Sequence, residues 1–376
     1  MSALDSIETR LVFTDEQAHL REEARRWLAA RSSMEAVRSL LTDRGGDDPA
    51  AWRELGAMGW LGIVTPQAHG GAGLGAVELA VLAEETGRAL LATPLLGHVL
   101  ASMVIGIGGS EAQRASWLPR LASGEIRAAW AHVEPDGAWR AAETTTRLEG
   151  GRLRGAKSFV TAADSADLFC VPVAGGAHVR IILVRRDADG VRVEAEEVLD
   201  RTRRQGRLFL EDVTVESDAL LERAAVEVEE SLLPLAWTAI AAEAVGGADA
   251  ALAMTAAYAA EREQFGKAIG SFQAIKHPLV NVLIATEQAR SLVYAAACAI
   301  AQTSADAVLL SHMARAAAAE AYGFATSRAI QFHGGFGFTE ECDAHLYRRR
   351  ALASRSAFGG PDYHRTRVAD LVLGRV

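Results

Sequence analysis

Apolar and polar positions follow a helical period in the first and last parts of the chain. After Thr14, which forms a capping-box sequence with Gln17, apolar residues recur at three- and four-residue spacing. Ala- and Leu-rich stretches with the same period predict long helices over residues 231–262, 272–302 and 305–331. Helices of this length favour a four-helix bundle in the last part of the chain.

The middle of the chain has the pattern of a β-domain. Short runs rich in Val, Ile, Leu, Thr and Phe predict strands over residues 128–133, 144–148, 153–160, 168–173, 179–184 and 208–215. Gly150-Gly151, between two of these runs, is typical of a two-residue hairpin turn. We therefore expect a helical domain over 1–123, an antiparallel β-domain over 124–226 and a helical bundle over 227–376.

Composition narrows the class of protein. The 376 residues and 40.0 kDa allow two or three domains, and a net charge of -9 argues against a nucleic-acid binder. Three widely spaced cysteines and an N-terminus without a signal-peptide pattern favour the cytoplasm. Residues 89–110 carry no Asp, Glu, Lys or Arg, but Pro94 and several glycines favour a buried helix and loop. We expect no membrane span.

Two glycine-containing motifs carry the candidate chemistry. The first is Arg262-Glu263-Gln264-Phe265-Gly266, which continues to Phe272-Gln273. It places a cation, an aromatic ring and amides in a turn that follows a predicted helix. The second is Gln331-Phe332-His333-Gly334-Gly335-Phe336-Gly337. Its three glycines leave backbone N–H groups that can approach a phosphate or a ring edge closely.

Together these motifs resemble the FAD-binding signature of the acyl-CoA dehydrogenase family. The order of helices, strands and helices is similar to that family over essentially the whole chain. The resemblance implies an α+β multidomain fold with a helical N-terminal domain, a middle antiparallel β-barrel and a C-terminal four-helix bundle. It also implies that FAD is bound across a subunit interface by Arg262, Phe265, Gln273, Gln331, Gly334 and Gly335.

Residues 155–161 are similar to the middle-domain strand of the same family. In that strand a threonine faces the flavin N5 edge and an aromatic residue packs beside the ring. The resemblance therefore implies these roles for Thr161 and Phe159. The family usually has Trp where this chain has Phe159, and either residue keeps an apolar wall.

The substrate side departs from the family pattern. Desaturation of an acyl thioester needs a base for the α-proton, usually a glutamate. The two positions at which the family places this glutamate correspond to Phe358 and Ala236, and neither is an acid. The family's Thr-Glu-Pro segment is represented by residues 133–139, which begin with Val133 and lack the threonine and the substrate-contacting serine.

Glu243 is the candidate substitute base, because a lone acid in an apolar helix often has a function. It follows Ala236 by seven residues, which corresponds to two turns, or about 10 Å, along a helix. Such a displacement is large compared with the placement that proton abstraction requires. The other interpretation of Glu243 is a structural hydrogen bond or ion pair.

Three functions remain open at this point. The first is a subunit whose glutamate comes from a paralogous partner. The second is a self-sufficient acyl-CoA dehydrogenase with an atypical base such as Glu243, and the third is a repurposed flavin oxidase. We favour the first, because Phe358-Gly359-Gly360 resembles heteromeric family members that act on steroid side-chain CoA thioesters in actinobacteria. The resemblance further implies a fatty or steroid acyl-CoA substrate, an electron-transfer flavoprotein as acceptor and a homo- or heterotetramer, a dimer of dimers.

Overall fold

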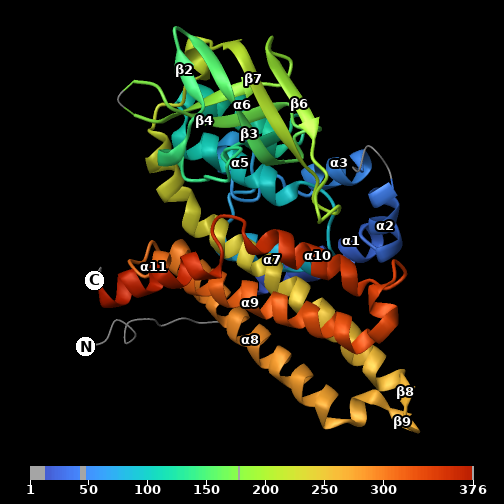
Figure 1. The fold of residues 1–376 in the computed structure, drawn as a ribbon. Coiled ribbons are helices and arrows are strands. Elements are labelled where there is room, and N and C mark those ends of the chain that lie inside the picture. The colour runs from blue at the N-terminus through green and yellow to red at the C-terminus, as the bar shows by residue number, and fades with distance from the viewer. Residues whose placement is uncertain (1–12, 43–47, 177, 375–376) are drawn as a thin grey trace. The chain divides into compact units, whose positions relative to one another are not determined.

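The structure, a computed structural model, describes residues 13–42, 48–176 and 178–374 (Figure 1). Within these residues the chain divides into two compact units. One unit comprises residues 13–36, 76–91 and 237–374, and the other comprises residues 37–75 and 92–236. The predicted boundaries of three sequential domains, 1–123, 124–226 and 227–376, stay predictions.

The first unit is helical, as the period of its apolar residues predicts. Thr14 caps its first helix in the predicted capping box with Gln17. Helix α9 packs against α8, α10 and α11, and α4 packs against α1 and α8. The helices of this unit are α1 (Asp15–Arg31), α4 (Ala76–Arg88), the second part of α7 (Ala225–Glu261), α8 (Gln273–Ala301), α9 (Ala307–His333), α10 (Ala344–Arg355) and α11 (Pro361–Leu373).

Helix α7 runs from the second unit into the first and is the most apolar long helix described. By length and composition alone it could cross a membrane, with a mean hydropathy of 1.3 over its most apolar window. However, 89% of that window is buried, as in a core helix of a folded protein. The apolar stretch that raised the question in the sequence forms the shorter helix α5 (Leu95–Gly108).

The second unit combines helices with two β-sheets. Its helices include α3 (Pro49–Ala57), α5 and α6 (Glu111–Ala122), with most of α2 (Met34–Thr42). One sheet has the strand order β1-β4-β5 and the other has the order β2-β3-β7-β6. The strands are β1 (Ala128–Trp130), β2 (Arg147–Glu149), β3 (Arg152–Thr161), β4 (Leu168–Val173), β5 (Arg180–Arg185), β6 (Val191–Ala195) and β7 (Gln205–Thr214).

The predicted sheet domain is confirmed, but a closed antiparallel barrel is not. The strands of this unit belong to two sheets, with an isolated parallel bridge between Arg147 and Ala174. Strand β1 pairs with β4 in parallel, with Ala128 opposite Leu168. The reason is the chain path: after β1 the chain forms the β2–β3 hairpin in the other sheet and then returns as β4. That hairpin turns at Gly150-Gly151, as predicted, with φ of 56° and 75°.

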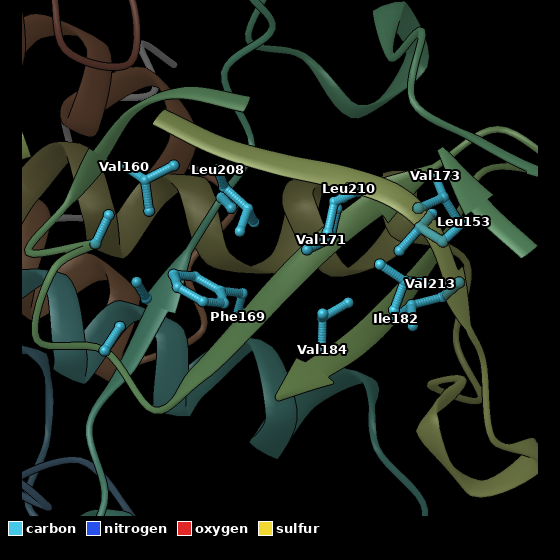
Figure 2. Packing of buried hydrophobic residues seen from close by; sticks show 14 residues of the cluster. Leu153, Val160, Phe169, Val171, Val173, Ile182, Val184, Leu208, Leu210 and Val213 are labelled. Atoms are coloured by element: carbon cyan, nitrogen blue, oxygen red, sulfur yellow. The ribbon is translucent and has the colours of Figure 1, made fainter. Parts of the chain in front are cut away.

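A continuous apolar core lies between the two sheets (Figure 2). Side chains of β3 and β7 meet those of β4 and β5, and the labelled members are buried. They are Leu153, Val160, Phe169, Val171, Val173, Ile182, Val184, Leu208, Leu210 and Val213. Because Val160 belongs to this core, the end of β3 is held in place, and Phe159 and Thr161 lie on either side of Val160.

Candidate functional site

The first motif forms a β-hairpin directly after α7. Strands β8 (Glu263–Gln264) and β9 (Lys267–Ala268) pair antiparallel, and Phe265 and Gly266 between them have φ of 55° and 79°. A positive φ is costly for a residue with a Cβ and is found where surrounding structure or function requires it. The Phe265 residue is also 92% exposed. A strained, exposed aromatic residue at a hairpin tip points to a role outside the fold of the single chain.

The second motif ends α9. Gly334 caps the helix with a φ of 63°, and residues Gly334–Phe338 form a short 3-10 helix. A Cβ at Gly334 or Gly335 would meet no other atom within 4 Å. Phe336 is 46% and Phe338 is 83% exposed. The backbone at the two glycines is therefore open to a ligand, beside exposed aromatic rings.

The fold brings the two motifs together. Tyr258, one turn before Arg262, stacks on His333 with ring centroids 4.3 Å apart. The N–H of Ile269 donates to the carbonyl of Arg262 at 2.8 Å, which folds the first motif back onto the end of α7. His333 is buried, and its Nδ1 lies 2.8 Å from the carbonyl of Ala329. His333 thus joins the motifs by packing, without an exposed imidazole that could act as a base.

The cofactor residues predicted in this unit all lie at the surface. They supply a cation, two side-chain amides, an aromatic ring and open backbone N–H groups, which is the donor set that a pyrophosphate and a ring system require. Their exposure in the single chain fits a ligand bound between subunits. These residues are Arg262, Phe265, Gln273, Gln331, Gly334 and Gly335.

The two cofactor residues predicted in the second unit lie at the end of β3. The pairing of β3 with β7 shifts register next to Phe159, whose φ is 53°. This bulge turns Phe159 outward, so that it is 49% exposed, and its N–H donates to Glu196 Oε2 at 3.0 Å. Thr161 borders a small pocket whose other residues include Thr93, Pro94, Ser165 and Arg204.

The Glu134 side chain, next to the substituted Val133, forms a buried polar network. Its carboxylate pairs with Lys157 and accepts hydrogen bonds from Thr144 Oγ1 at 2.5 Å and Thr145 Oγ1 at 2.7 Å. Burial opposes ionisation, but the hydrogen bonds of Lys157 and the threonines prevail and lower the pKa of Glu134 to about 2. Glu134 is therefore a permanently ionised structural group and not a proton acceptor.

The segment that follows is fixed to the first part of α7. The Arg140 guanidinium and the N–H of Ala141 both donate to the carboxylate of Glu229, which is 2% exposed. Arg140 also lies over the ring of Trp139 at 5.3 Å. Burial raises the pKa of Glu229, although Arg140 and Ala141 oppose it. In place of the family's serine-containing segment, this chain thus has a bulky, anchored loop.

Glu243 is paired. Its Oε1 accepts from Arg350 Nη1 at 3.0 Å, and the two side chains are 7% and 1% exposed. Arg350 also donates to the carbonyl of Leu91 at 3.4 Å. A proton transfer to Glu243 would leave the buried Arg350 charge without its partner, which is costly. The geometry therefore favours the structural interpretation of Glu243, and a role as catalytic base stays a prediction.

The two positions predicted to correspond to the family's glutamate carry no acid. Phe358 lies half-buried in the turn between α10 and α11, with a φ of 54°. Ala236 is fully buried on α7. The next residue, Trp237, donates from Nε1 to the carbonyl of Phe358 at 2.9 Å.

Sequence reasoning missed a buried cluster beside this turn, which we call the anchoring cluster: Trp237, His312, Arg315 and His364. Its members come from α7, α9 and α11, and all are at most 4% exposed. Trp237 and His364, the two members farthest apart in the sequence, are separated by 127 positions. Because single His, Trp and Arg residues carry no spacing signal, only the fold could bring them together.

Comparison with known proteins finds similarity over most of the chain. Residues 14–125 match the acyl-CoA dehydrogenase N-terminal domain, and residues 228–373 match the acyl-CoA dehydrogenase C-terminal domain. The chain is 31% identical to acyl-CoA dehydrogenase IpdE2 of Mycolicibacterium smegmatis over 350 residues, which cover 93% of this chain and 96% of that protein.

Two solved structures are similar in both sequence and fold. One is a variant of the Tcur3481-Tcur3483 steroid ACAD, with 32% identity, a TM-score of 0.86 and coverage of 96% of this chain and 98% of that one. The other is the ChsE4-ChsE5 complex from Mycobacterium tuberculosis, with 26% identity, a TM-score of 0.89 and coverage of 98% and 100%.

Proposed function

The chain belongs to the acyl-CoA dehydrogenase family, and from this premise we propose that it serves α,β-desaturation of an acyl-CoA thioester as a subunit without its own catalytic glutamate. One observation carries the proposal. The exposed cofactor-type residues around Arg262 and Gly334 are complete, whereas Phe358 and Ala236 occupy both glutamate positions. A paralogous partner that carries the glutamate would complete the site.

The chemistry divides between the cofactor and the protein. In desaturation the α-hydrogen leaves as a proton to a carboxylate, and the β-hydrogen leaves as a hydride. FAD, the cofactor of this family, supplies the hydride acceptor when bound. In this chain Arg262 and the N–H groups of Gly334 and Gly335 would bind phosphate, Phe265 would pack on a ring, and Thr161 would face the flavin.

Exposed apolar side chains support a partner subunit. Besides Phe265 and Phe338, helix α8 exposes Val280, Leu283 and Ile284 at 52%, 44% and 49%. Their spacing places these three on one face of α8, and apolar faces of this kind mark protein interfaces. The names of the two similar solved structures each join two proteins. We therefore propose a heterotetramer, with a homotetramer as the alternative.

The substrate class rests on the relatives. One similar structure is described as a steroid ACAD, which supports a thioester of steroid side-chain type over an ordinary fatty acyl-CoA. The bulky loop around Trp139, anchored by Arg140 to Glu229, supports the proposal that this chain's own substrate segment is altered. An electron-transfer flavoprotein is the proposed electron acceptor, on the family resemblance.

The proposal is tested by titrating the flavin with thioesters. The chain, alone and with a glutamate-bearing paralogue, is loaded with FAD and titrated anaerobically with short, long and steroid-type acyl-CoAs. We expect bleaching of the visible flavin band only in the mixed assembly. Arg262→Ala should abolish flavin retention by that assembly, while Arg53→Ala, on α3 outside both motifs, should leave it unchanged.

Other outcomes would assign other functions. Bleaching in the isolated chain that a folded Glu243→Gln variant loses would show a self-sufficient dehydrogenase. Rapid reoxidation of the reduced flavin by oxygen would show an oxidase. Either result would overturn the proposed dependence on a partner's glutamate.

A further inference from the structure

The turn between α10 and α11, residues 356–360, is strained, and yet each of its carbonyl groups has a hydrogen-bond partner. Phe358 and Gly359 have φ of 54° and 96°. A Cβ at Gly359 would lie 2.5 Å from Cδ1 of Tyr363, so only glycine fits there. A non-glycine residue such as Phe358 keeps a left-handed backbone only where the surroundings hold it. The contacts that hold this turn are therefore informative.

Buried side chains account for most carbonyl groups of this segment. Arg315 Nη2 donates to the carbonyls of Ser354, Arg355 and Ala357, the last two at 3.2 and 3.1 Å. Trp237 Nε1 donates to Phe358, and His364 Nε2 lies 3.2 Å from the carbonyl of Gly359.

The backbone supplies the remaining bond. The carbonyl of Ser356 accepts from the N–H of Gly359 at 3.3 Å. Every carbonyl from Ser354 to Gly359 thus has a donor. Such pairing of every carbonyl, from the last residues of α10 through the turn, restricts the backbone of this segment to one conformation.

The two histidines of the anchoring cluster fix each other's tautomers. A carbonyl can only accept, so His364 Nε2 carries the proton that faces Gly359. Neutral His364 then has a bare Nδ1, which lies 2.8 Å from His312 Nδ1, so His312 must donate there. The Trp237 ring covers His312 with centroids 4.2 Å apart. Both ring nitrogens of His364 are therefore committed to this arrangement.

Charges around His364 keep it neutral. Burial, together with the Arg315 guanidinium and His312, lowers the pKa of His364 to about 3. Trp237 and Tyr363 contact its ring edge-on, and Arg355, whose charge lowers the pKa of Arg315, ends α10. The arrangement holds throughout the physiological pH range, so the turn is anchored constitutively and is not a pH switch.

We propose that Trp237, His312, Arg315 and His364 are positioning residues that hold the Phe358 turn in one conformation, and that Phe358 at its apex is a fixed wall that selects the acyl group. This inference rests on the proposed function, which places Phe358 at the family's glutamate position. A base and a wall both need a fixed position, but the apolar Phe358 side chain can only serve as a wall. The density of anchoring contacts fits a wall.

The anchoring is tested by hydrogen exchange on the whole chain without any ligand. Trp237→Phe keeps the ring and removes only the N–H that bonds Phe358. Its matched control is Trp52→Phe, because buried Trp52 donates in the same way to the carbonyl of Gly124 at 3.0 Å. We expect exchange in the peptide spanning 356–360 to accelerate about fivefold in Trp237→Phe, the effect of losing one hydrogen bond. Trp52→Phe should not change it.

NMR of the ring nitrogens of labelled histidines is a second, independent test of this arrangement, because it reports which ring nitrogen carries the proton. It should show His364 protonated at Nε2 and His312 protonated at Nδ1, and His364→Asn should identify both signals. Unchanged exchange in Trp237→Phe, equal acceleration in both tryptophan variants, or the opposite tautomers would each overturn the anchoring.

The wall is tested in the FAD-loaded assembly with the partner. Phe358→Ala should raise the affinity for the bulkiest thioester, relative to the affinity for the shortest, about tenfold. This gain is expected because the space of one large apolar side chain becomes available to the acyl group. Unchanged selectivity would overturn the wall. If no thioester binds any assembly, the proposed function and the wall fall together, while the exchange and tautomer results still decide the anchoring.

Discussion

At the scale of single residues, the charges inside the helical unit depend on partners. Glu243 and Arg350 are nearly inaccessible to water, and neither charge would be tolerated there alone. By contrast, the pair of Glu287 and Arg290 lies near the surface, where Glu287 is 52% exposed. The same kind of Glu–Arg ion pair therefore affects the free energy of unfolding differently at the two places.

Replacing Glu243 by Gln should lower the free energy of unfolding by about 3–5 kcal/mol, because the buried Arg350 charge loses its partner. Glu287→Gln should cost less than about 1 kcal/mol. Urea unfolding followed by circular dichroism measures both. Equal effects of the two variants would show that water reaches the Glu243 pair and would reopen the case for Glu243 as a base.

At the scale of elements, helices α4 and α7 approach each other backbone to backbone. A Cβ at Gly246 of α7 would lie 1.8 Å from the carbonyl oxygen of Glu84 in α4. A Cβ at Gly87 of α4 would lie 2.1 Å from the carbonyl oxygen of Glu243. This close crossing brings α4 and the Glu243 segment of α7 together, and no side chain fits between them.

The crossing predicts opposite effects for two glycines within helices. Gly246→Ala should destabilise the protein by more than about 2 kcal/mol, since one helix has to move away from the other. Gly323→Ala in α9 should be neutral or stabilise by up to about 1 kcal/mol, because the nearest atom to its Cβ would be Arg355 Nη1 at 3.8 Å. Thermal unfolding of the two variants decides the point, and a harmless Gly246→Ala would refute the close crossing.

At the scale of the whole molecule, each unit contains a histidine that is buried in its neutral form. In the second unit, the Nε2 atom of His98 lies 3.0 Å from the carbonyl oxygen of Leu121. The Nδ1 atom of His98 accepts a hydrogen bond from the N–H of Ala128. Burial lowers the pKa of His98 to about 4 and that of His364 to about 3, from 6.5. Burial likewise lowers the pKa of His132, in the second unit, to about 4. The unfolded chain therefore protonates three histidines at a pH at which the folded chain keeps them neutral.

A fall in pH should consequently destabilise the protein at pH values well above those at which carboxylates titrate. The contribution of the three histidines is complete above pH 6.5 and is lost as the pH falls toward about 4, by up to about 4.1 kcal/mol per pH unit. Unfolding free energies measured between pH 7 and 4 test this. His364→Asn should remove about a third of the slope, whereas His19→Gln, at an exposed position, should leave it intact.

Much of this protein can be predicted from sequence, because the signals involved are local. Apolar period, capping residues and the Gly150-Gly151 turn act over a few neighbouring residues, so the long helices and most strands were predictable. The motifs around Arg262 and Gly334 are continuous segments, and the lack of an acid at Phe358 is a fact of composition at one position. Strand β6 escaped prediction because its residues are largely exposed and lack an apolar run.

The tertiary structure decided what depends on partners far apart in the chain. Neither the parallel pairing of β1 with β4 nor the division of the strands into two sheets follows from the pattern within any strand. The partner of Glu243 lies 107 residues away, and the anchoring cluster joins three helices. A residue type states which interaction a side chain can make, but only the fold determines which partner reaches it, because burial and distance are properties of the packed molecule.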